Sequence, residues 1–421
     1  MKFVFVCYGT RGDVEPCAAI GRELLRRGHD VRMAVPPDLV RFVESSGLAA
    51  VQCGPDARMW QDLHREFLTH LFRRFWKVRD LVRLFGKDRE LLNQCWNEID
   101  TTLISLAADA DLVFTLVIGE QPAANVAEYY DIPLATLHTQ PLRPNGQAVP
   151  AALAPAMRFA MNLFEWLDWP IVRPLERPQR RRLRLPKAKT PAARRIRERG
   201  SLEIQAYDEV CFPGLAAEWA RFDKRRPFVG SLTMELPGEA DEEVSSWIAA
   251  GTPPIFFGFG STLVQSPAET ISMIAAACAQ LGERALICSA ESDFSGVPHF
   301  DHVKVVRTLN YGTIFPVCRA VVHHGGAGTT AAGLRAGVPQ LIISTFIDQA
   351  LWGARVKQLK VGTARRFSTN EESLVADLRV ILAPEYTARA REIAPRITKP
   401  AAGTAMAVDL LEDFAGRSRR G

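Results

Sequence analysis

Apolar residues along this chain fall into short continuous runs that alternate with longer stretches of helical spacing, and the alternation occurs in two blocks. In the first block, near-continuous apolar runs predict buried parallel strands, and apolar residues three to four positions apart predict the helices that connect them. Strands are expected at 2–8, 30–36, 111–117 and 133–139, and helices at 15–29, 38–47, 57–108 and 120–130.

The second block begins after an acidic stretch with Pro and Gly at 226–243. The repeated order of strand and helix predicts a doubly wound parallel sheet in each half of the chain. Strands are expected at 254–261, 284–290, 320–326 and 339–344, and helices at 268–282, 327–337 and 404–416. We therefore expect an N-terminal domain at 1–222, a linker at 223–245, a C-terminal domain at 246–396 and a closing helix and tail at 397–421.

Composition agrees with this organisation and narrows the class of protein. A chain of 421 residues is too long for one hydrophobic core. No apolar run approaches the roughly 18 residues of a membrane span, and the N-terminus has the pattern of a strand rather than a signal peptide. The eight cysteines are scattered without a C-x-x-C pair, which predicts reduced, mostly buried thiols in a cytoplasmic protein. A net charge of +5 is too mild for a uniformly basic nucleic-acid binder.

The stretch "VVHHGGAGTTAAGLRAGVPQ", residues 321–340, carries the strongest chemical signal. A buried strand there ends in a glycine loop that opens a helix, and helix N-termini with bare backbone amides bind anions. His324 would lie at the carboxyl end of the strand, where open α/β sheets bind ligands, and its imidazole can donate to a phosphate oxygen. Thr329 and Thr330 can cap the helix or donate to the same phosphate.

Two nucleotide-binding classes lose support at this loop. No Lys follows the glycines, so the loop is not the phosphate loop of ATP hydrolases. Neither this loop nor the first loop, at 9–16, has the G-x-G-x-x-G spacing of NAD-dependent dehydrogenases.

Two segments some three hundred residues apart resemble one family. "HHGGAGTTAAGLRAGVPQLIISTFIDQALWGARV" and "FVCYGTRGDVEPCAAIGRELLRRGHDV" are similar to motifs of family 1 glycosyltransferases, in the bacterial natural-product and glycolipid branch, and most similar to mycobacterial glycopeptidolipid glycosyltransferases. The resemblance implies the GT-B fold, in which two Rossmann-like domains with doubly wound parallel sheets face each other across a cleft. The donor nucleotide would then bind the C-terminal domain and the acceptor the N-terminal one.

The resemblance also implies the residues of a donor site. The donor diphosphate would contact His324, Gly325, Gly326, Gly328 and Thr329, with Ser261 of a second strand-to-loop junction also in reach. Asp348 and Gln349 match the pair that hydrogen-bonds the donor sugar. The segment with Arg307, Leu309 and Tyr311 matches the base-binding region, but the Trp that often stacks on the base is missing, which leaves uracil and thymine open.

Asp13, in the first loop, matches the position of the catalytic base, where many relatives have His instead. Its carboxylate would take the proton from the acceptor hydroxyl as that oxygen attacks the sugar, with inversion at the anomeric carbon. An Asp at this place can equally cap the first helix, and the two roles are compatible. The resemblance implies no metal or other cofactor, and we interpret the D-x-D pattern at 109–111 as turn and capping chemistry.

Two features bear on the acceptor. The aromatic residues Phe67, Phe72, Phe75 and Trp76 have helical spacing, which is typical of core packing and also fits an apolar acceptor channel. The run 180–199 holds ten Lys or Arg and one Glu. It would be either a solvated loop or a contact with anionic lipid headgroups, helped by Trp166 and Trp169. No aromatic-interleaved RNA motif accompanies it, so we expect no nucleic-acid partner.

The sequence therefore predicts an inverting, metal-independent glycosyltransferase. It would move a hexose or 6-deoxyhexose from a dTDP- or UDP-sugar to a hydroxyl of a hydrophobic acceptor such as a glycopeptidolipid, in the cytoplasm or peripherally at the inner face of the plasma membrane. A nucleotide-sugar epimerase of the same fold, a sterol- or macrolide-type glucosyltransferase and a non-catalytic nucleotide-sugar binder are the alternatives.

Overall fold

A computed structural model describes residues 1–57, 59, 78–147, 149, 151–222, 224–238, 240–260, 266–289, 296–366 and 370–418. The chain divides into two compact units, and the division does not follow a single cut. Unit 1 contains Met1–Ala206, Gly214–Leu232 and the chain from Ala401 onward, whereas unit 2 contains Tyr207–Pro213 and Thr233–Pro400.

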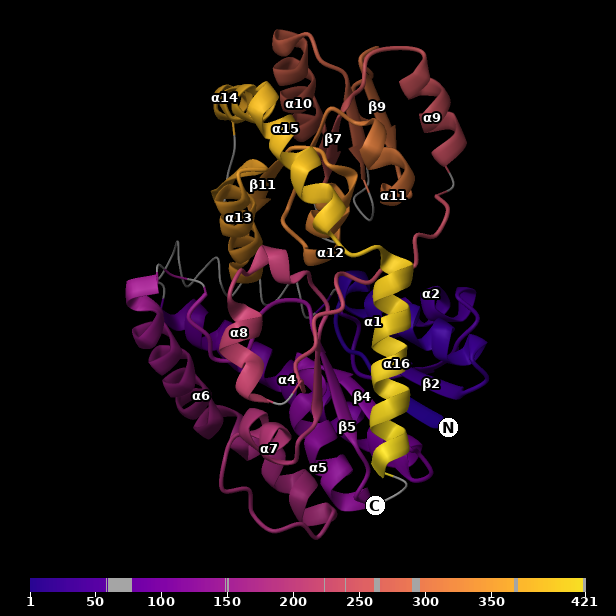
Figure 1. The fold of residues 1–421 in the computed structure, drawn as a ribbon, viewed down its shortest axis with the longest axis vertical. Coiled ribbons are helices and arrows are strands. Elements are labelled where there is room, and N and C mark those ends of the chain that lie inside the picture. Colours follow the sequence, from indigo (N-terminus) through magenta and orange to yellow (C-terminus); the bar gives the residue numbers. More distant parts are fainter. Residues whose placement is uncertain are drawn as a thin grey trace. The chain divides into compact units, whose positions relative to one another are not determined.

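Unit 1 is built on a six-stranded parallel sheet with the order β3-β2-β1-β4-β5-β6 (Figure 1). Its strands are β1 Lys2–Val6, β2 Asp30–Val35, β3 Ala49–Gln52, β4 Leu112–Leu116, β5 Leu134–His138 and β6 Leu202–Gln205. Its described helices are α1 Arg11–Arg26, α2 Val40–Ser45, α4 Val78–Ala107, α5 Glu120–Tyr130, α6 Ala154–Arg182, α7 Ala192–Glu198, α8 Leu215–Trp219 and α16 Pro400–Ser418.

Unit 2 repeats this architecture with the sheet order β12-β11-β10-β7-β8-β9, again parallel throughout. Its strands are β7 Ile255–Gly258, β8 Ala285–Cys288, β9 Val303–Val306, β10 Ala320–His323, β11 Gln340–Ser344 and β12 Gly362–Arg366. Its described helices are α9 Asp241–Ala249, α10 Pro267–Leu281, α11 Tyr311–Ile314, α12 Ala327–Ala336, α13 Ile347–Leu359, α14 Glu371–Ile381 and α15 Pro384–Ile393.

The strand order fixes where each sheet can bind a ligand. In both units the strands are added outward in two directions from a central pair, which is β1 and β4 in unit 1 and β7 and β10 in unit 2. Connections leave this central pair toward opposite sides, so a crevice opens beyond the carboxyl ends of the two strands. The first loop follows β1 and the glycine loop follows β10, so both predicted motifs lie at such a switch point.

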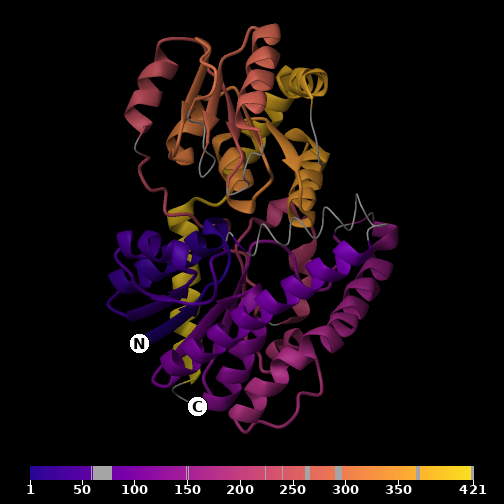
Figure 2. The same ribbon diagram turned by 180° about the vertical axis from the view of Figure 1, so that it is seen from behind.

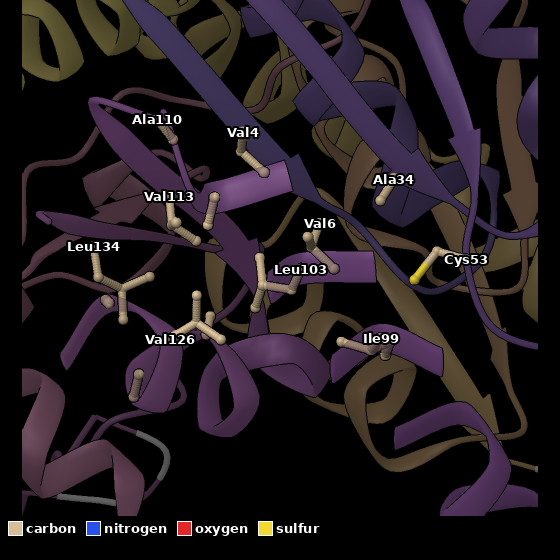
Figure 3. Close-up of a cluster of buried hydrophobic side chains, with 14 of the residues drawn as sticks. Val4, Val6, Ala34, Cys53, Ile99, Leu103, Ala110, Val113, Val126 and Leu134 are labelled. Atoms are coloured by element: carbon tan, nitrogen blue, oxygen red, sulfur yellow. The ribbon is translucent and has the colours of Figure 1, made fainter. Parts of the chain in front are cut away.

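Side chains alternate between the two faces of each sheet, as the period of two in a strand requires. In unit 1, Val4 and Val6 pack with Leu103 of α4 and Val126 of α5 in one buried cluster (Figure 3). Phe5 lies between Val4 and Val6 in β1, so its side chain points to the opposite face of the sheet. There its ring stacks on that of Phe114 of β4, with 4.4 Å between the ring centroids. Helices therefore cover the sheet on both faces.

Unit 2 has the same two-sided core. On one face, Ile255 and Phe257 of β7 pack in a buried cluster with α10 and α14. On the other face, Phe256 packs in a second cluster with α9, α11 and α12. All eight cysteines of the chain are buried, as the sequence predicts.

The doubly wound α/β fold predicted for each half is confirmed, and the helix expected at 120–130 has those bounds in α5. The first helix is different, because α1 begins at Arg11 rather than near Glu15. Pro16 lies inside α1, whose first turn is closed earlier by the contacts between Thr10 and Asp13.

The segment 140–200 contains more helix than its prolines indicate. Helix α6 runs through Pro170, Pro174 and Pro178 without a break. These prolines are exposed and are spaced by four, so the carbonyls that lose their N–H partners lie along one stripe that water can solvate.

The prediction of a solvated loop at 180–199 is wrong for much of the run. Residues up to Arg182 complete α6, and α7 covers Ala192–Glu198. Five of the ten cations pair with carboxylates. These pairs are Arg180–Glu128, Arg182–Asp100, Arg194–Glu198, Arg195–Glu176 and Arg199–Asp131.

Helix α16 brings the C-terminal end of the chain back to unit 1 (Figures 1 and 2). The Arg27 guanidinium, just beyond α1, lies 2.6 Å from Asp409 and 2.7 Å from Glu412, and Nε2 of His29 lies 2.6 Å from Glu412. In the described part of the chain, no helix is both long enough and apolar enough to cross a membrane.

The short segment Tyr207–Pro213 belongs to unit 2 although both of its neighbours along the chain belong to unit 1. The ring of Phe212 lies 5.6 Å and that of Tyr207 6.4 Å from Trp352 of α13, centroid to centroid. The carboxylate of Asp208 accepts the backbone N–H of Thr398 at 2.8 Å.

Candidate active site

Asp13 lies in the first turn of α1, just beyond the carboxyl end of β1. Oδ2 of Asp13 accepts the Thr10 backbone N–H at 2.8 Å and the Thr10 hydroxyl at 3.0 Å, so the carboxylate closes the first turn of α1. Gly9 is in the left-handed region at φ +149°, and a Cβ there would lie 2.5 Å from the same oxygen. Asp13 therefore caps α1 as predicted. These hydrogen bonds orient its carboxylate, which remains half-exposed.

His323, the last residue of β10, fixes the glycine loop through its side chain. Its Nδ1 accepts the Gly325 backbone N–H at 3.1 Å, so the ring proton sits on Nε2, which donates to the Gln340 side-chain oxygen at 2.9 Å. The Gln340 amide in turn donates to the Thr330 carbonyl of α12 at 3.2 Å. Burial lowers the pKa of His323 to about 3, so this residue is a neutral structural link.

Gly325 is the residue that turns the chain into the loop. Its φ is +97°, and a Cβ would lie 2.8 Å from the Ile342 side chain and 3.0 Å from the Gln349 carbonyl oxygen. Gly326 then caps α12 in extended conformation, and the first backbone amide that bonds back to it is Thr330, at 2.9 Å. The amides ahead of Thr330 precede the hydrogen-bond ladder of the helix, as an anion site at a helix N-terminus requires.

His324 lies between two glycines at the switch point of unit 2. A Cβ on Gly260, in the turn after β7, would approach the imidazole to 2.3 Å, and one on Gly326 would lie 2.7 Å from Nε2. Burial lowers the pKa of His324 to about 4, so the ring is neutral at pH 7. Its Nδ1 is buried without a hydrogen-bond partner among the described residues. A buried polar atom of this kind calls for a partner from outside the chain.

The predicted sugar-binding pair is at the start of α13. Oε1 of Gln349 accepts the backbone N–H groups of Thr345 at 2.8 Å and Phe346 at 3.1 Å. Any contact of Gln349 with a sugar hydroxyl would therefore use its amide nitrogen. Asp348 is exposed in the first turn of α13. This capping by Gln349 was not foreseen from the sequence.

The three residues expected near the base do not share one environment. Tyr311 stacks on Phe315 at 4.6 Å and packs edge-on against Phe256 at 5.4 Å, so its ring contributes to the core. Leu309 packs against the same cluster, whereas the Arg307 side chain is exposed. The expected positions Ser261, Phe67, Phe72, Phe75 and Trp76 lie outside the described residues.

The D-x-D pattern lies at the amino-terminal end of the central strands of unit 1, opposite to the end that Asp13 follows. Asp109 pairs with the Lys2 ammonium at 2.5 Å, and Asp111 accepts the Lys2 backbone N–H at 2.7 Å. Both carboxylates therefore fix the beginnings of β1 and β4, at the end of the strands away from the switch point. Among the described residues, no group of three or more His, Cys, Asp or Glu is arranged to hold a metal ion.

A buried ionic cluster in unit 1 was missed. Glu120 accepts from His138 and Arg143, both at 2.7 Å, and Glu203 accepts from Arg143 and from Arg226. Burial raises the pKa of Glu120, but Arg143 and His138 outweigh it and hold that pKa at about 2. The cluster fixes the loop after β5. Its one signal in the sequence is Glu203, a charge inside a fully buried strand.

Comparison with known proteins assigns both halves of the chain. Residues 3–98 match the family described as glycosyltransferase family 28 N-terminal domain, and residues 272–412 match the family described as erythromycin biosynthesis protein CIII-like, C-terminal domain. The chain is 57% identical over 422 residues to an uncharacterized glycosyltransferase of Mycobacterium tuberculosis, with 100% of both chains covered. It is 28% identical to a sterol 3-beta-glucosyltransferase of Arabidopsis thaliana, covering 97% of this chain and 67% of the relative.

Solved structures agree in fold. The calicheamicin glycosyltransferase CalG4 superposes with a TM-score of 0.67 at 19% identity, covering 99% of this chain and 98% of that one. The glycosyltransferase VinC, solved in complex with dTDP, superposes with a TM-score of 0.63 at 17% identity, covering 100% of both. The predicted GT-B fold is thereby confirmed.

Proposed function

This chain belongs to the glycosyltransferases of GT-B fold that join a family 28 N-terminal domain to an erythromycin CIII-like C-terminal domain, and from that premise we propose its reaction. A hexose, with a 6-deoxyhexose as our preference, moves from a dTDP- or UDP-sugar to a hydroxyl of a hydrophobic acceptor such as a glycopeptidolipid. The anomeric carbon is inverted and no metal takes part. Membership of this family decides against the epimerase alternative.

The unpartnered Nδ1 of His324 carries the donor assignment. The neutral ring carries one N–H, and with that proton on Nδ1 it can donate a hydrogen bond to a diphosphate oxygen beside the first amides of α12. These donors are fixed before the substrate arrives. They stabilise the negative charge that grows on the leaving diphosphate as the bond to C1 breaks, which is the role such preorganised groups play in catalysis.

Asp13 supplies the other half of the reaction. Its carboxylate takes the proton of the acceptor hydroxyl while that oxygen forms its bond to C1 and the nucleoside diphosphate leaves with the electron pair of the broken bond. Attack opposite the leaving group inverts C1. Asp348 and the Gln349 amide nitrogen, in the first turn of α13, are the groups we assign to the sugar hydroxyls.

Two relatives guide the choice of substrates. The dTDP bound to VinC favours dTDP over UDP for this chain as well. The similarity to a sterol glucosyltransferase along 97% of the chain supports a hydrophobic acceptor and makes a sterol-type glucosyltransferase the second candidate.

Calorimetric titration tests the donor site first. We expect dTDP or UDP to bind, GDP and NAD to bind poorly, and His324→Ala to weaken binding at least tenfold. His299→Ala is the matched control, because the His299 side chain is fully exposed. Equal binding by wild type and His324→Ala would refute the assignment, and binding of NAD alone would favour a dehydrogenase.

Turnover of a labelled dTDP-sugar with lipid acceptors then tests Asp13. Asn at this position keeps an oxygen for the Thr10 N–H but cannot take a proton. Asp13→Asn should therefore lower the turnover number about 10²–10⁴-fold with little change in melting temperature or dTDP affinity. Unchanged turnover in this variant would leave Asp13 as a helix cap only.

A further inference from the structure

The outer surface of helix α6 carries the largest set of exposed apolar side chains in one described element. Phe159 is 69% exposed, Phe164 68% and Leu167 62%. Leu163 and Trp166 add to the same surface at 43% each. Contiguous exposed apolar side chains of this size mark a binding surface rather than a random distribution.

Helical geometry gathers these side chains on one side. Phe159, Leu163 and Trp166 follow each other at spacings of four and three, which is one stripe of a helix. The opposite side of α6 is fixed on α5, where the Gln179 amide oxygen accepts from Asn125 at 2.6 Å and Arg180 pairs with Glu128 at 2.8 Å. Figures 1 and 2 both place α6 at the periphery of its unit.

The same stripe becomes cationic toward the C-terminal end of the helix. Arg173, Arg177 and Arg181 continue it at spacings of four, and Arg177 and Arg181 are exposed. Of the acids in α6, Glu176 is buried and Glu165 half-buried, while Asp168, four residues after Phe164, is exposed.

Exposed cations of the following loop extend this positive region. Arg184, Lys187 and Lys189 are exposed. These cations follow the C-terminal end of α6 in the chain and add to the positive charge beyond its apolar stripe. We call the whole region, from Phe159 to Lys189, the α6 face.

We infer that the α6 face docks on an anionic lipid bilayer. Phe, Leu and Trp side chains on one stripe of a helix, with arginines beyond them, are typical of helices that lie in the membrane interface. The apolar half would enter the boundary between headgroups and acyl chains, and each nearby cation would strengthen binding through its attraction to anionic headgroups. A protein partner would need an acidic side chain opposite each of these cations, whereas the headgroups of an anionic bilayer present negative charge over their whole surface.

The purpose of this docking rests on the proposed function, because the enzyme would meet a lipid-like acceptor at a bilayer surface. The test of docking itself does not require glycosyltransferase activity. Co-sedimentation of the full chain with vesicles of phosphatidylglycerol and phosphatidylcholine should show binding. Vesicles of phosphatidylcholine alone should bind at least tenfold less, and added salt should weaken binding to the anionic vesicles.

The triple variant Phe159→Ser, Phe164→Ser, Leu167→Ser should lower partitioning to anionic vesicles at least tenfold. The control triple variant Leu25→Ser, Val380→Ser, Met406→Ser changes residues of similar type that are 44–45% exposed on other helices, and it should bind as wild type does. Calorimetric dTDP binding by the same preparations verifies that unit 2 is intact and keeps failure of this inference separate from failure of the donor site.

Three outcomes would overturn the inference. The first is wild-type protein that stays in the supernatant with anionic vesicles. The second is a dimer in light scattering that the α6 triple variant dissociates, which would assign the face to a second copy of the chain. The third is protection of Phe159 and Trp166 from hydroxyl-radical oxidation before vesicles are added, which would mean that another segment of the chain covers the face.

Discussion

Gly325 in the glycine loop and Gly328 in the first turn of α12 are three residues apart, yet their surroundings are opposite. Gly325 needs a positive φ and has no room for a Cβ, whereas a Cβ on Gly328 would meet nothing within 4 Å. Gly325→Ala should therefore cost about 1–3 kcal/mol of stability from backbone strain alone and distort the donor loop. We expect a lower melting temperature and weaker dTDP binding.

Gly328→Ala is the matched control and also a probe of the ligand. Its melting temperature should equal or exceed that of wild type, because Gly328 lies in α12, where Ala is favoured over Gly. A loss of dTDP affinity without a fall in melting temperature would mean that the ligand approaches the backbone here. If Gly325→Ala melts and binds as wild type does, the loop is more adaptable than its packing indicates.

The two adjacent histidines should make the protein sensitive to acid. Their pKa values of about 3 and about 4 lie below the ordinary 6.5, so the unfolded chain takes up protons that the native state does not. The stability that depends on the neutral rings is complete above pH 6.5 and declines as the pH falls toward 4. The decline amounts to at most about 1.4 kcal/mol per pH unit for each ring.

Thermal melting at pH 7 and pH 5 measures this decline. The loss of melting temperature between these pH values should be smaller in His324→Asn than in wild type. His299→Asn, at an exposed position, should leave the loss unchanged. An equal loss in all three proteins would place the acid sensitivity elsewhere.

At the scale of residues, the sequence predicted the strand, the glycine turn and the helix at 320–337 because these elements are local in the chain. The binding of a donor at this loop stays a prediction. It did not predict the link from His323 to Gln340, because the two residues meet only through the pairing of β10 and β11. The cap that Gln349 forms with Thr345 is local, and it was overlooked because Gln349 had been assigned to the donor sugar. The ionic cluster around Glu203 joins residues far apart in sequence and was missed for the same reason.

Among the elements, helices α6 and α7 are tied together by a buried ion pair. The Glu176 carboxylate is 1% exposed and is contacted by Arg195, which also lies 3.2 Å from the Asn125 side chain of α5. Arg195→Leu would leave a buried carboxylate unpaired, which typically costs about 3–5 kcal/mol. We expect this variant to unfold at clearly lower urea concentration than wild type.

Lys187→Leu is the control for that experiment, because Lys187 belongs to the same basic run but is exposed. Its urea midpoint should stay close to that of wild type. Two variants with the same low midpoint would mean that the whole run, and not the α6–α7 pair, supports unit 1.

These elements also explain where pattern reading fails. A cluster of arginines in a sequence indicates a solvated segment, unless the tertiary structure brings acidic side chains to it. Here Glu128 of α5 pairs with Arg180, and Glu176 of α6 pairs with Arg195 of α7. Prolines indicate a break in a helix, unless their spacing keeps the unpaired backbone carbonyls on one solvent-exposed side. Pro170, Pro174 and Pro178 have such a spacing in α6.

On the scale of the molecule, α16 makes unit 1 depend on the end of the chain. Its Ala407, Val408, Leu411 and Ala415 are fully buried, and burial of a Val or Leu side chain contributes about 1.5–3 kcal/mol. Truncation after Pro400 should therefore lower the unfolding temperature of unit 1, while unit 2 keeps its dTDP binding.

Scanning calorimetry with and without dTDP separates the two effects, because the ligand should raise only the transition of unit 2. Truncation after Ser418 removes the tail but not the helix and should melt as the full chain does. If truncation after Pro400 abolishes dTDP binding together with the unit 1 transition, the two units do not fold independently.

The two-domain class could be predicted because each sheet is built from local strand and helix repeats. The segments Tyr207–Pro213 and Ala401–Gly421 could not be assigned to their units from the sequence, since their partners are distant. The chain passes between the units at 206–207, 213–214, 232–233 and 400–401.

These passages limit how such enzymes can recombine during evolution or in the laboratory. A single crossover in the linker would join Trp352 of one parent to Tyr207 and Phe212 of the other, and Glu412 of one parent to Arg27 and His29 of the other. A working hybrid must exchange the short segment and the last helix together with their partners. The two units are thus inherited as interleaved pieces of gene, and a chimera designed as two halves would carry mismatched contacts at both places.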